Sequence, residues 1–469
     1  MSGLAYRTGR SRAVAGPRPP KMRATPKSVR AMLDRTRSAA LFAGIAKQGD
    51  VVEFGGLGLR IWLVSDPTLA REVLVDRGRQ VTKGFGIRMI SIGLGNGILT
   101  NEDPVSHKRN RRLINPAFSA TALKKYADVM AAAAMRADER WRSGHVVEIT
   151  DEMGRITLDV VGRTLLGDDS DRDARTVIDS LEVILKRFGI GFIPGATKLL
   201  DTNLPPAVKI KNAVTSMRNT VERVVTDHKR GDRRYDDMVA ALLAATEDGE
   251  GFTEQQVLDE TLTLMLAGFE TTANALSWTW WLLDQNPDVA ARLRAEIDAT
   301  IGDAVPTYDD IARLPYTMAT IAETMRLRPP AWILERETLE PFDLGDYHLN
   351  AGQTVLMSPW VIHQDPRWWG HDAHAYRPDR WINSDGAFDH SAPGQPRGAY
   401  FPFGAGSRMC IGEQFAWSEA VLVLATLARR WAPAIVPGQR VKTWAAVTLR
   451  PHPGIKMRLE PAPALTSVD

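Results

Sequence analysis

A single cysteine, Cys410, lies in a glycine-rich segment that runs from Phe403 to Gly412 and precedes a predicted buried helix over residues 413–430. The positive end of a helix dipole favours a thiolate, and glycines let the backbone turn tightly and approach a flat partner. A lone cysteine is more often a small buried apolar residue. One cysteine excludes an internal disulfide and a multi-cysteine metal site, so any chemistry of Cys410 rests on its own sulfur.

A second reactive group lies near the middle of the chain, where Glu270 and Thr271 interrupt a nearly continuous apolar run over residues 262–283. A carboxylate beside a hydroxyl can pass protons, and a buried carboxylate needs partners or a task. A capping-box pattern at Thr253 and a stop at Pro287 predict one helix of about 50 Å, at about 1.5 Å per residue. Because of its central carboxylate, we expect this helix to cross a protein core rather than a membrane.

The cysteine segment has the pattern Phe-x-x-Gly-x-Arg-x-Cys-x-Gly, filled by Phe403, Gly406, Arg408, Cys410 and Gly412. It resembles the haem-binding loop of the cytochrome P450 superfamily, the haem-thiolate monooxygenases. The resemblance implies that Cys410 is the axial ligand of haem b iron, that Phe403 packs near the sulfur and that Arg408 pairs with a haem propionate. A thiolate ligand favours O–O cleavage, and an arginine suits a carboxylate.

The segment that begins at Ala267 is similar to the oxygen-activation motif of the same family. The resemblance implies that Ala267 and Gly268 leave room beside the iron. It also implies that Thr271 hydrogen-bonds the bound oxygen and that Glu270 relays protons to it. Thr272 is expected only to bond back to a helix carbonyl.

Further charged residues match family positions. Glu323 and Arg326 lie three residues apart, on one helix face, and alone would be an ordinary surface ion pair. With Arg380 they resemble the structural triad that supports the haem loop. His107, which replaces the usual Trp, and Arg111 are expected near one propionate; Arg336 is expected near the other.

Positions that correspond to pocket segments of the family are all apolar, although several could be plain core. They suggest a neutral hydrophobic substrate, such as a terpenoid or another natural product. These positions are Phe85, Ile87, Met89, Ile90, Leu94, Phe188, Ile190, Phe192, Leu266, Phe269, Ala331, Trp332, Ile333 and Val447.

The element pattern predicts a mainly α protein with a small β region. Short β-branched runs occur at 51–54 and 59–64, a short helix is expected at 67–75, and 447–449 reads as a strand. The resemblance implies the P450 fold, with haem between the long central helix and the helix after Cys410. We expect one catalytic domain over residues 41–469.

Residues 1–40 are expected to form a basic, proline-rich flexible arm. Ten Lys and Arg lie between Arg7 and Arg37, against one acidic residue, Asp34. The remaining chain from Ser38 holds 49 basic and 55 acidic residues, so the pI near 8.9 does not indicate a nucleic-acid-binding body.

The resemblance implies O2- and electron-dependent oxidation of an organic substrate, hydroxylation or a related reaction, in secondary metabolism. Electrons are expected from separate proteins, a ferredoxin and its reductase, because no reductase segment follows Cys410. We expect a cytoplasmic protein with no nucleic-acid partner and no membrane span. The alternatives are oxidative coupling, peroxygenase or isomerase chemistry on the same fold, and a haem-binding sensor. The Glu270–Thr271 pair argues against the peroxygenase, isomerase and sensor alternatives.

Overall fold

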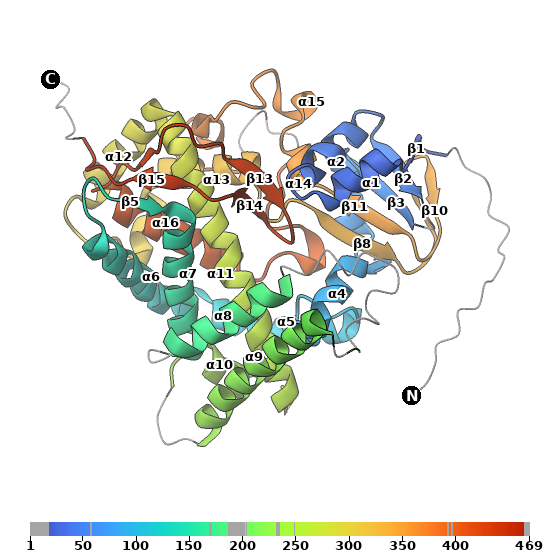
Figure 1. Cartoon of the computed structure of the whole chain (residues 1–469), viewed down its shortest axis with the longest axis horizontal. Coiled ribbons are helices and arrows are strands. Elements are labelled where there is room, and N and C mark those ends of the chain that lie inside the picture. The colour runs from blue at the N-terminus through green and yellow to red at the C-terminus, as the bar shows by residue number, and fades with distance from the viewer. Residues whose placement is uncertain are drawn as a thin grey trace.

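The computed structural model describes residues 18–56, 59–167, 171–185, 202, 204–230, 235–247, 249–391, 394 and 397–463. Helices gather around one long central helix, and the largest sheet lies to one side of them (Figure 1). The α-helices are α1 (Pro26–Leu33), α2 (Ser38–Ala46), α3 (Pro67–Arg71), α4 (Phe85–Leu94), α5 (Pro104–Ile114), α6 (Ala120–Arg140), α7 (Ile149–Leu166), α8 (Asp171–Leu185), α9 (Pro205–Arg230), α10 (Met238–Ala244), α11 (Glu254–Gln285), α12 (Pro287–Ile301), α13 (Pro315–Leu327), α14 (Pro359–Ile362), α15 (Pro366–Trp369) and α16 (Glu413–Ala428).

The strands are short and belong to several sheets. They are β1 (Lys21–Arg23), β2 (Val51–Gly56), β3 (Leu59–Val64), β4 (Val81–Lys83), β5 (Val146–Glu148), β6 (Thr246–Glu247), β7 (Glu250–Gly251), β8 (Leu334–Thr338), β9 (Phe342–Leu344), β10 (Tyr347–Leu349), β11 (Thr354–Met357), β12 (Ala434–Ile435), β13 (Lys442–Ala445), β14 (Leu449–His452) and β15 (Lys456–Arg458). This mainly helical fold with a small sheet region is the fold class that the sequence predicts.

The central helix α11 begins and ends where the sequence predicts. The Thr253 hydroxyl accepts a hydrogen bond from the Gln256 N–H at 3.2 Å, and the Gln256 side chain accepts one from the Thr253 N–H at 2.9 Å. Both N–H groups would otherwise lack an intrahelical partner. Pro287 starts α12 directly afterwards. Among the described residues, no helix has both the length and the apolar composition that crossing a membrane requires.

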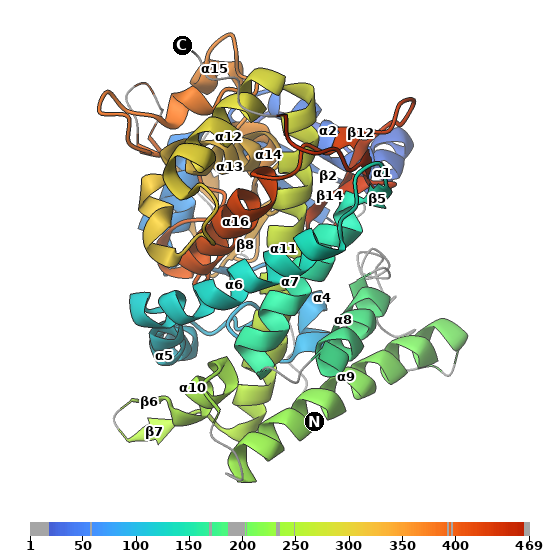
Figure 2. The same cartoon turned by 90° about the vertical axis from the view of Figure 1, so that its left-hand side faces the viewer.

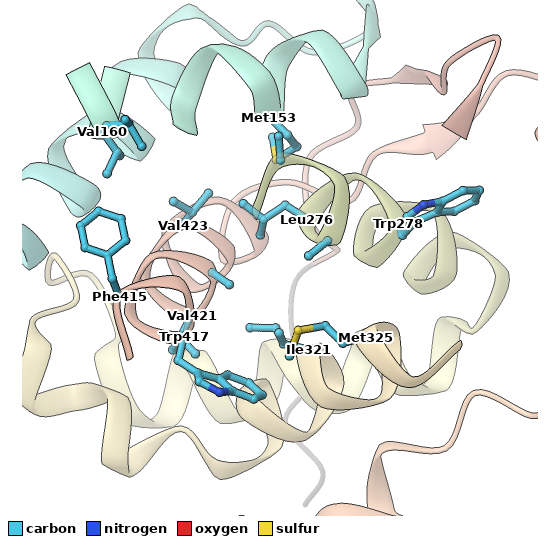
Figure 3. Packing of buried hydrophobic residues seen from close by; sticks show 14 of the residues in the cluster. Met153, Val160, Leu276, Trp278, Ile321, Met325, Phe415, Trp417, Val421 and Val423 are labelled. Atoms are coloured by element: carbon cyan, nitrogen blue, oxygen red, sulfur yellow. The ribbon is translucent and has the colours of Figure 1, made fainter. Parts of the chain in front are cut away.

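Helices α7, α13 and α16 bury α11 by packing apolar side chains against it. Figure 3 shows Met153 from α7 and Val423 from α16 converging on Leu276, with Ile321 of α13 on the opposite side. Figure 2 shows α8 and α9 side by side, and their buried side chains belong to the same core cluster. The removal of these apolar side chains from water stabilises the position of α11 among its neighbours.

The largest sheet has the strand order β1-β2-β3-β11-β8-β4. β1 runs parallel to β2 and β11 parallel to β3, whereas the other neighbours are antiparallel. The helix expected over 67–75 is α3 followed by a π-helical turn over Glu72–Asp76. The strand expected at 447–449 starts only at Leu449, because residues 446–448 form the bend between β13 and β14.

The structure corrects the expected flexible arm for residues 18–40. Lys21 to Arg23 pair in register with Glu53 to Gly55, and the Lys21 ammonium lies 3.4 Å from the Glu53 carboxylate. Thr25 and Ser28 then form a capping box that starts α1. Residues 1–17 lie outside the described residues. Composition alone misled here, because backbone pairing with β2 satisfies the N–H and C=O groups of a segment that is basic and rich in proline.

Candidate active site

One cavity of about 790 Å³ has Cys410 in its wall. The loop before α16 is closed by a hydrogen bond from the Cys410 N–H to the Phe403 carbonyl at 2.9 Å. Gly406 has φ +71°, and a Cβ there would stand 2.2 Å from the Leu74 carbonyl oxygen. Only glycine therefore allows the loop to approach the preceding elements so closely. The Phe403 ring lies 6.1 Å from the Trp417 ring, at the start of α16.

The Cys410 side chain is exposed to this cavity. Burial within the protein raises the pKa of its thiol to about 11, although the Gly412 N–H and the charges of Arg111 and Lys83 oppose the rise. The isolated chain therefore keeps the thiol protonated at neutral pH. A metal cation that bonds to the sulfur would lower the thiol pKa, because it stabilises the thiolate directly.

A cluster of five basic side chains lines the same cavity: Lys83, His107, Arg111, Arg336 and Arg408. Arg408 donates to the carbonyls of Asn101, at 2.8 Å, and Glu102, at 3.1 Å. Arg111 donates to the carbonyl of Met409, the residue before the cysteine. These bonds fix the two guanidinium groups by backbone oxygens, and neither group forms an ion pair with a carboxylate among the described residues.

The cluster is electrostatically strained without an anion. Burial and the neighbouring Arg408, Lys83 and Arg111 lower the pKa of His107 to about 3, so its imidazole is neutral. Burial and Arg408 lower the pKa of Arg336 to about 10, and burial lowers the pKa of Lys83 well below its usual value. A thiol on one wall and unneutralised cations on another fit a flat iron cofactor that carries two carboxylates.

Sequence reasoning missed Lys83. It is 7% exposed, although lysine is almost never buried without a partner, and it follows two buried residues of β4. Its place at the end of a short buried strand is the only signal in the sequence. The folded chain shows in addition that Lys83 lines the cavity.

The two faces of α11 line two different cavities. Thr271 lies in the wall of the cavity that holds Cys410, with Ala267 and Gly268 one turn earlier. Its hydroxyl donates to the Ala267 carbonyl at 2.6 Å. Glu270 faces a second cavity of about 520 Å³ between α7, α8 and α11. The acid and the alcohol of the predicted pair therefore lie on opposite sides of the helix.

Glu270 is held by the β14 region. Its Oε1 accepts a hydrogen bond from the Thr448 hydroxyl at 2.5 Å and lies 2.8 Å from an Arg450 guanidinium nitrogen. Asn274, one turn later on α11, donates to the Thr448 hydroxyl at 3.2 Å. The carboxylate is 8% exposed, so these partners satisfy a charge that burial would otherwise disfavour.

The structure brings seven of the fourteen predicted pocket residues to the Cys410 cavity: Phe85, Ile87, Ile90, Ala331, Trp332, Ile333 and Val447. Leu266 and Phe269 were wrongly expected there, because they line the second cavity with Glu270. Met89 is half-buried and Leu94 is buried in the core, and neither is in the wall of either cavity. Phe188, Ile190 and Phe192 lie outside the described residues.

Two further groups of wall residues were not foreseen. The first comes from α1, α2 and the turn between them, and the second from α7 and α10. They are Met32, Leu33, Arg35, Ser38 and Phe42 in the first group, and Val161, Thr164, Leu165 and Met238 in the second. Nothing local in the sequence marks them, because long-range packing alone brings them to the cavity.

Glu323, Arg326 and Arg380 meet in a buried ion-pair network. Glu323 lies 2.8 Å from Arg326 and 3.0 Å from Arg380, and the Trp381 indole N–H donates to it at 2.9 Å. None of the three charged side chains is more than 8% exposed. Asp372 lies beside this network, and its carboxylate pairs with Arg377.

His363 joins this network to the cysteine loop. Arg326 donates to the His363 carbonyl at 2.8 Å, and the His363 Nε2 accepts from the Phe401 N–H at 3.0 Å. Phe401 in turn accepts from the Gly404 N–H at 3.0 Å. Burial, reinforced by the Arg326 charge, lowers the pKa of His363 to about 3. The imidazole is therefore neutral, as its acceptor role requires.

A second network holds the segment after α4 against α11. Asp259 accepts from the Asn96 N–H at 2.8 Å, and the buried Glu260 accepts from the Ile98 N–H at 2.7 Å. Arg218 of α9 lies 2.8 Å from Asp259 and also donates to the Gly93 carbonyl at 3.4 Å. One arginine thus ties α9, α4 and α11 together beside the cavity.

The chain is similar to known proteins over most of its length. The family model described as Cytochrome P450 matches residues 38–458. The chain is 35% identical to cyclooctatin synthase of Streptomyces melanosporofaciens, over 92% of this chain and 93% of the relative. It is 32% identical to pentalenene oxygenase of Streptomyces avermitilis, over 90% and 93%, and 32% identical to cyclooctat-9-en-7-ol 5-monooxygenase of Streptomyces melanosporofaciens, over 86% of each chain.

Proposed function

Because this chain belongs to the cytochrome P450 family, a family of haem-thiolate monooxygenases, we propose that it inserts oxygen into a hydrophobic natural product, of terpenoid type. The observation that carries the proposal is the cavity of about 790 Å³ whose wall contains Cys410 and is otherwise largely apolar. A volume of this order suits one drug-sized molecule beside a cofactor. The relatives named for cyclooctatin, pentalenene and cyclooctat-9-en-7-ol support a terpenoid.

Haem b would be held by Cys410 through its sulfur and by the basic cluster through the propionates. Arg408 and Arg336, with Arg111, His107 and Lys83, supply donors on the cavity wall. When bound, haem supplies the electron-transfer and O2 chemistry that no side chain provides. The neutral His107 acts as a hydrogen-bond donor rather than as a charge, because its pKa is lowered to about 3.

Glu270 and Thr271 would supply protons from the second cavity to the first. The Thr271 hydroxyl now donates to the Ala267 carbonyl, so its oxygen can accept a proton from the Glu270 side while its own proton turns toward the cavity. To reach the Thr271 oxygen, the Glu270 carboxylate must first break its contacts with Arg450 and Thr448. The relay thus depends on an ion pair that can open.

Electrons come from separate redox partners, as in the family. The basic residues of α5 lie near the cysteine loop, and two of them, Lys108 and Arg112, are exposed. They would bind a ferredoxin, which receives its electrons from a reductase. A cytoplasmic location agrees with a ferredoxin partner.

The proposal is tested with the haem-loaded enzyme, a ferredoxin system and a panel of cyclic terpenes and terpene alcohols. Substrates are found by the change they cause in the haem spin state. The product should then gain one oxygen atom, and this atom should be labelled when the reaction is run under 18O2. An unlabelled product, or an isomer of unchanged mass, would instead support the peroxygenase or isomerase alternative.

A further inference from the structure

The Cys410 cavity reaches the N-terminal part of the chain. Its wall includes Met32, Leu33 and Arg35, from α1 and the turn after it, opposite Ala446 and Val447 of the bend between β13 and β14. The Ala445 N–H donates to the Arg35 carbonyl at 2.8 Å, and the Trp332 indole donates to the Ala446 carbonyl at 2.9 Å. The first bond fastens the N-terminal segment to the bend, and the second ties the bend to Trp332, so specific contacts hold this part of the wall in place.

Arg35 is the charged member of this wall, and its guanidinium has no carboxylate partner within the described chain. The nearby Asp34 is already bound to Thr36 and to the exposed Arg37, which lies 3.2 Å away. The charge that acts on Arg35 is the like charge of Arg450, and burial together with this repulsion lowers the Arg35 pKa. Arg450 itself is paired with Glu270 at 2.8 Å.

A half-buried arginine of this kind has unused hydrogen-bonding capacity. The guanidinium group has five N–H donors and no acceptor, and it stays charged at neutral pH. The Trp444 ring, 5.8 Å from the guanidinium carbon, limits where it can turn. The other residues that line this cavity are largely apolar, and Phe42, Ile61 and Leu356 are among them.

We propose that Arg35 is a specificity-determining residue that binds an oxygen acceptor at the end of the substrate remote from Cys410. This rests on the proposed function and narrows its substrate class to a hydrophobic skeleton that already carries a carboxylate, carbonyl or hydroxyl oxygen. Only an acceptor satisfies a guanidinium, and a carboxylate satisfies it best, through charge-assisted bonds. A reaction that installs oxygen on the skeleton must therefore precede this enzyme.

The test uses two ligands that anchor at the iron and extend along the cavity: N-dodecylimidazole and its analogue that ends in a carboxylate. Binding is followed by the Soret shift of the haem-loaded protein, so no turnover is needed. In the unchanged enzyme the carboxylate ligand should bind about 10-fold tighter or more than the alkyl ligand, since hydrogen bonds to charged groups are the strong ones. In Arg35→Met this preference should vanish, while the affinity for the alkyl ligand stays the same.

Arg37→Met is the matched control, because Arg37 lies two residues away and its side chain is 70% exposed. It should keep the preference for the carboxylate ligand. An equal loss of both ligands in Arg35→Met, or no change in their ratio, overturns the role of Arg35 and leaves the proposed function standing. Failure of both ligands to shift the Soret band of the unchanged protein overturns the proposed function and the Arg35 proposal together.

Discussion

Glu270 and Thr271 are neighbours in the chain, yet Glu270 binds Arg450 at 2.8 Å in one cavity while Thr271 faces Cys410 in the other. Successive residues of a helix point about 100° apart, which places the two side chains in different spaces. The helix α11 separates these two cavities, of which one is polar and the other largely apolar. A proton that moves from Glu270 to Thr271 would cross this boundary without opening the substrate cavity to water.

Thr271→Ala should uncouple electron use from product formation, because it removes the hydroxyl of the proposed proton relay. We expect reductant to be consumed at a comparable rate while peroxide rises severalfold and product falls. Peroxide and product are measured per reductant oxidised. Thr271→Ser keeps the hydroxyl and should retain most of the coupling. Unchanged coupling in the alanine variant would contradict the relay.

Cys410→Ser should abolish the thiolate signature in the absorption of the reduced, carbon-monoxide-bound protein. A serine oxygen cannot donate electron density as a thiolate does. Ser407→Ala is the control, since Ser407 is an exposed member of the same loop. If the serine variant keeps the thiolate band, Cys410 is not the ligand.

Glu323→Gln should destabilise the fold by about 3–5 kcal/mol, because it leaves the charges of Arg326 and Arg380 buried without their anion. Urea unfolding measures the loss, and haem retention should fall with it. Asp379→Asn removes the partner of Arg292 in a pair whose side chains are both about half exposed, and should cost at most about 1 kcal/mol. Similar costs for both variants would refute a special role of the buried network.

His363 should make the protein less stable as the pH falls below 6.5. Its folded pKa is lowered to about 3. Between these values only the unfolded chain binds the proton, so acid favours unfolding by up to about 1.4 kcal/mol per pH unit from this residue. His363→Gln keeps an acceptor for the Phe401 N–H but does not titrate. Its unfolding free energy should vary less between pH 6.5 and 5, and an unchanged pH dependence would count against this assignment.

Arg218→Ala should speed the entry and exit of ligands severalfold, because it breaks the tie of α9 to Asp259 and Gly93. Stopped-flow mixing with imidazole measures both rates. Arg223→Ala provides the control on the same helix, as Arg223 pairs with Asp173 of α8 instead. Equal rates in the two variants would show that the tie does not limit access.

Sequence motifs predicted those parts of the site whose residues lie close together in the chain. The loop around Cys410, the cap of α11 and the Glu323–Arg326 pair each depend on residues a few positions apart, and the structure shows each in the expected arrangement. The helical period could also have corrected one error. With Ala267 and Thr271 on the cysteine side, Phe269 must turn away by about 200° from Ala267, toward the second cavity.

Long-range contacts set the rest, and these could not be predicted. Lys83 is buried because β4 pairs with β8, which carries Arg336 opposite it. Arg35 lines the cavity because its carbonyl meets Ala445, some four hundred positions later in the chain. Composition and spacing describe neither relationship, since the first arises from the pairing of two strands and the second from the contact of a turn with the end of β13.

The hydrogen bond between Arg35 and Ala445 joins two segments that are synthesised at different times. The ribosome makes the N-terminal wall of the cavity first and the bend between β13 and β14 only after Cys410. While the chain grows, Met32 and Phe42 have no opposite wall, and their apolar surfaces stay accessible to solvent or chaperones. The complete pocket therefore forms only after β14 has emerged.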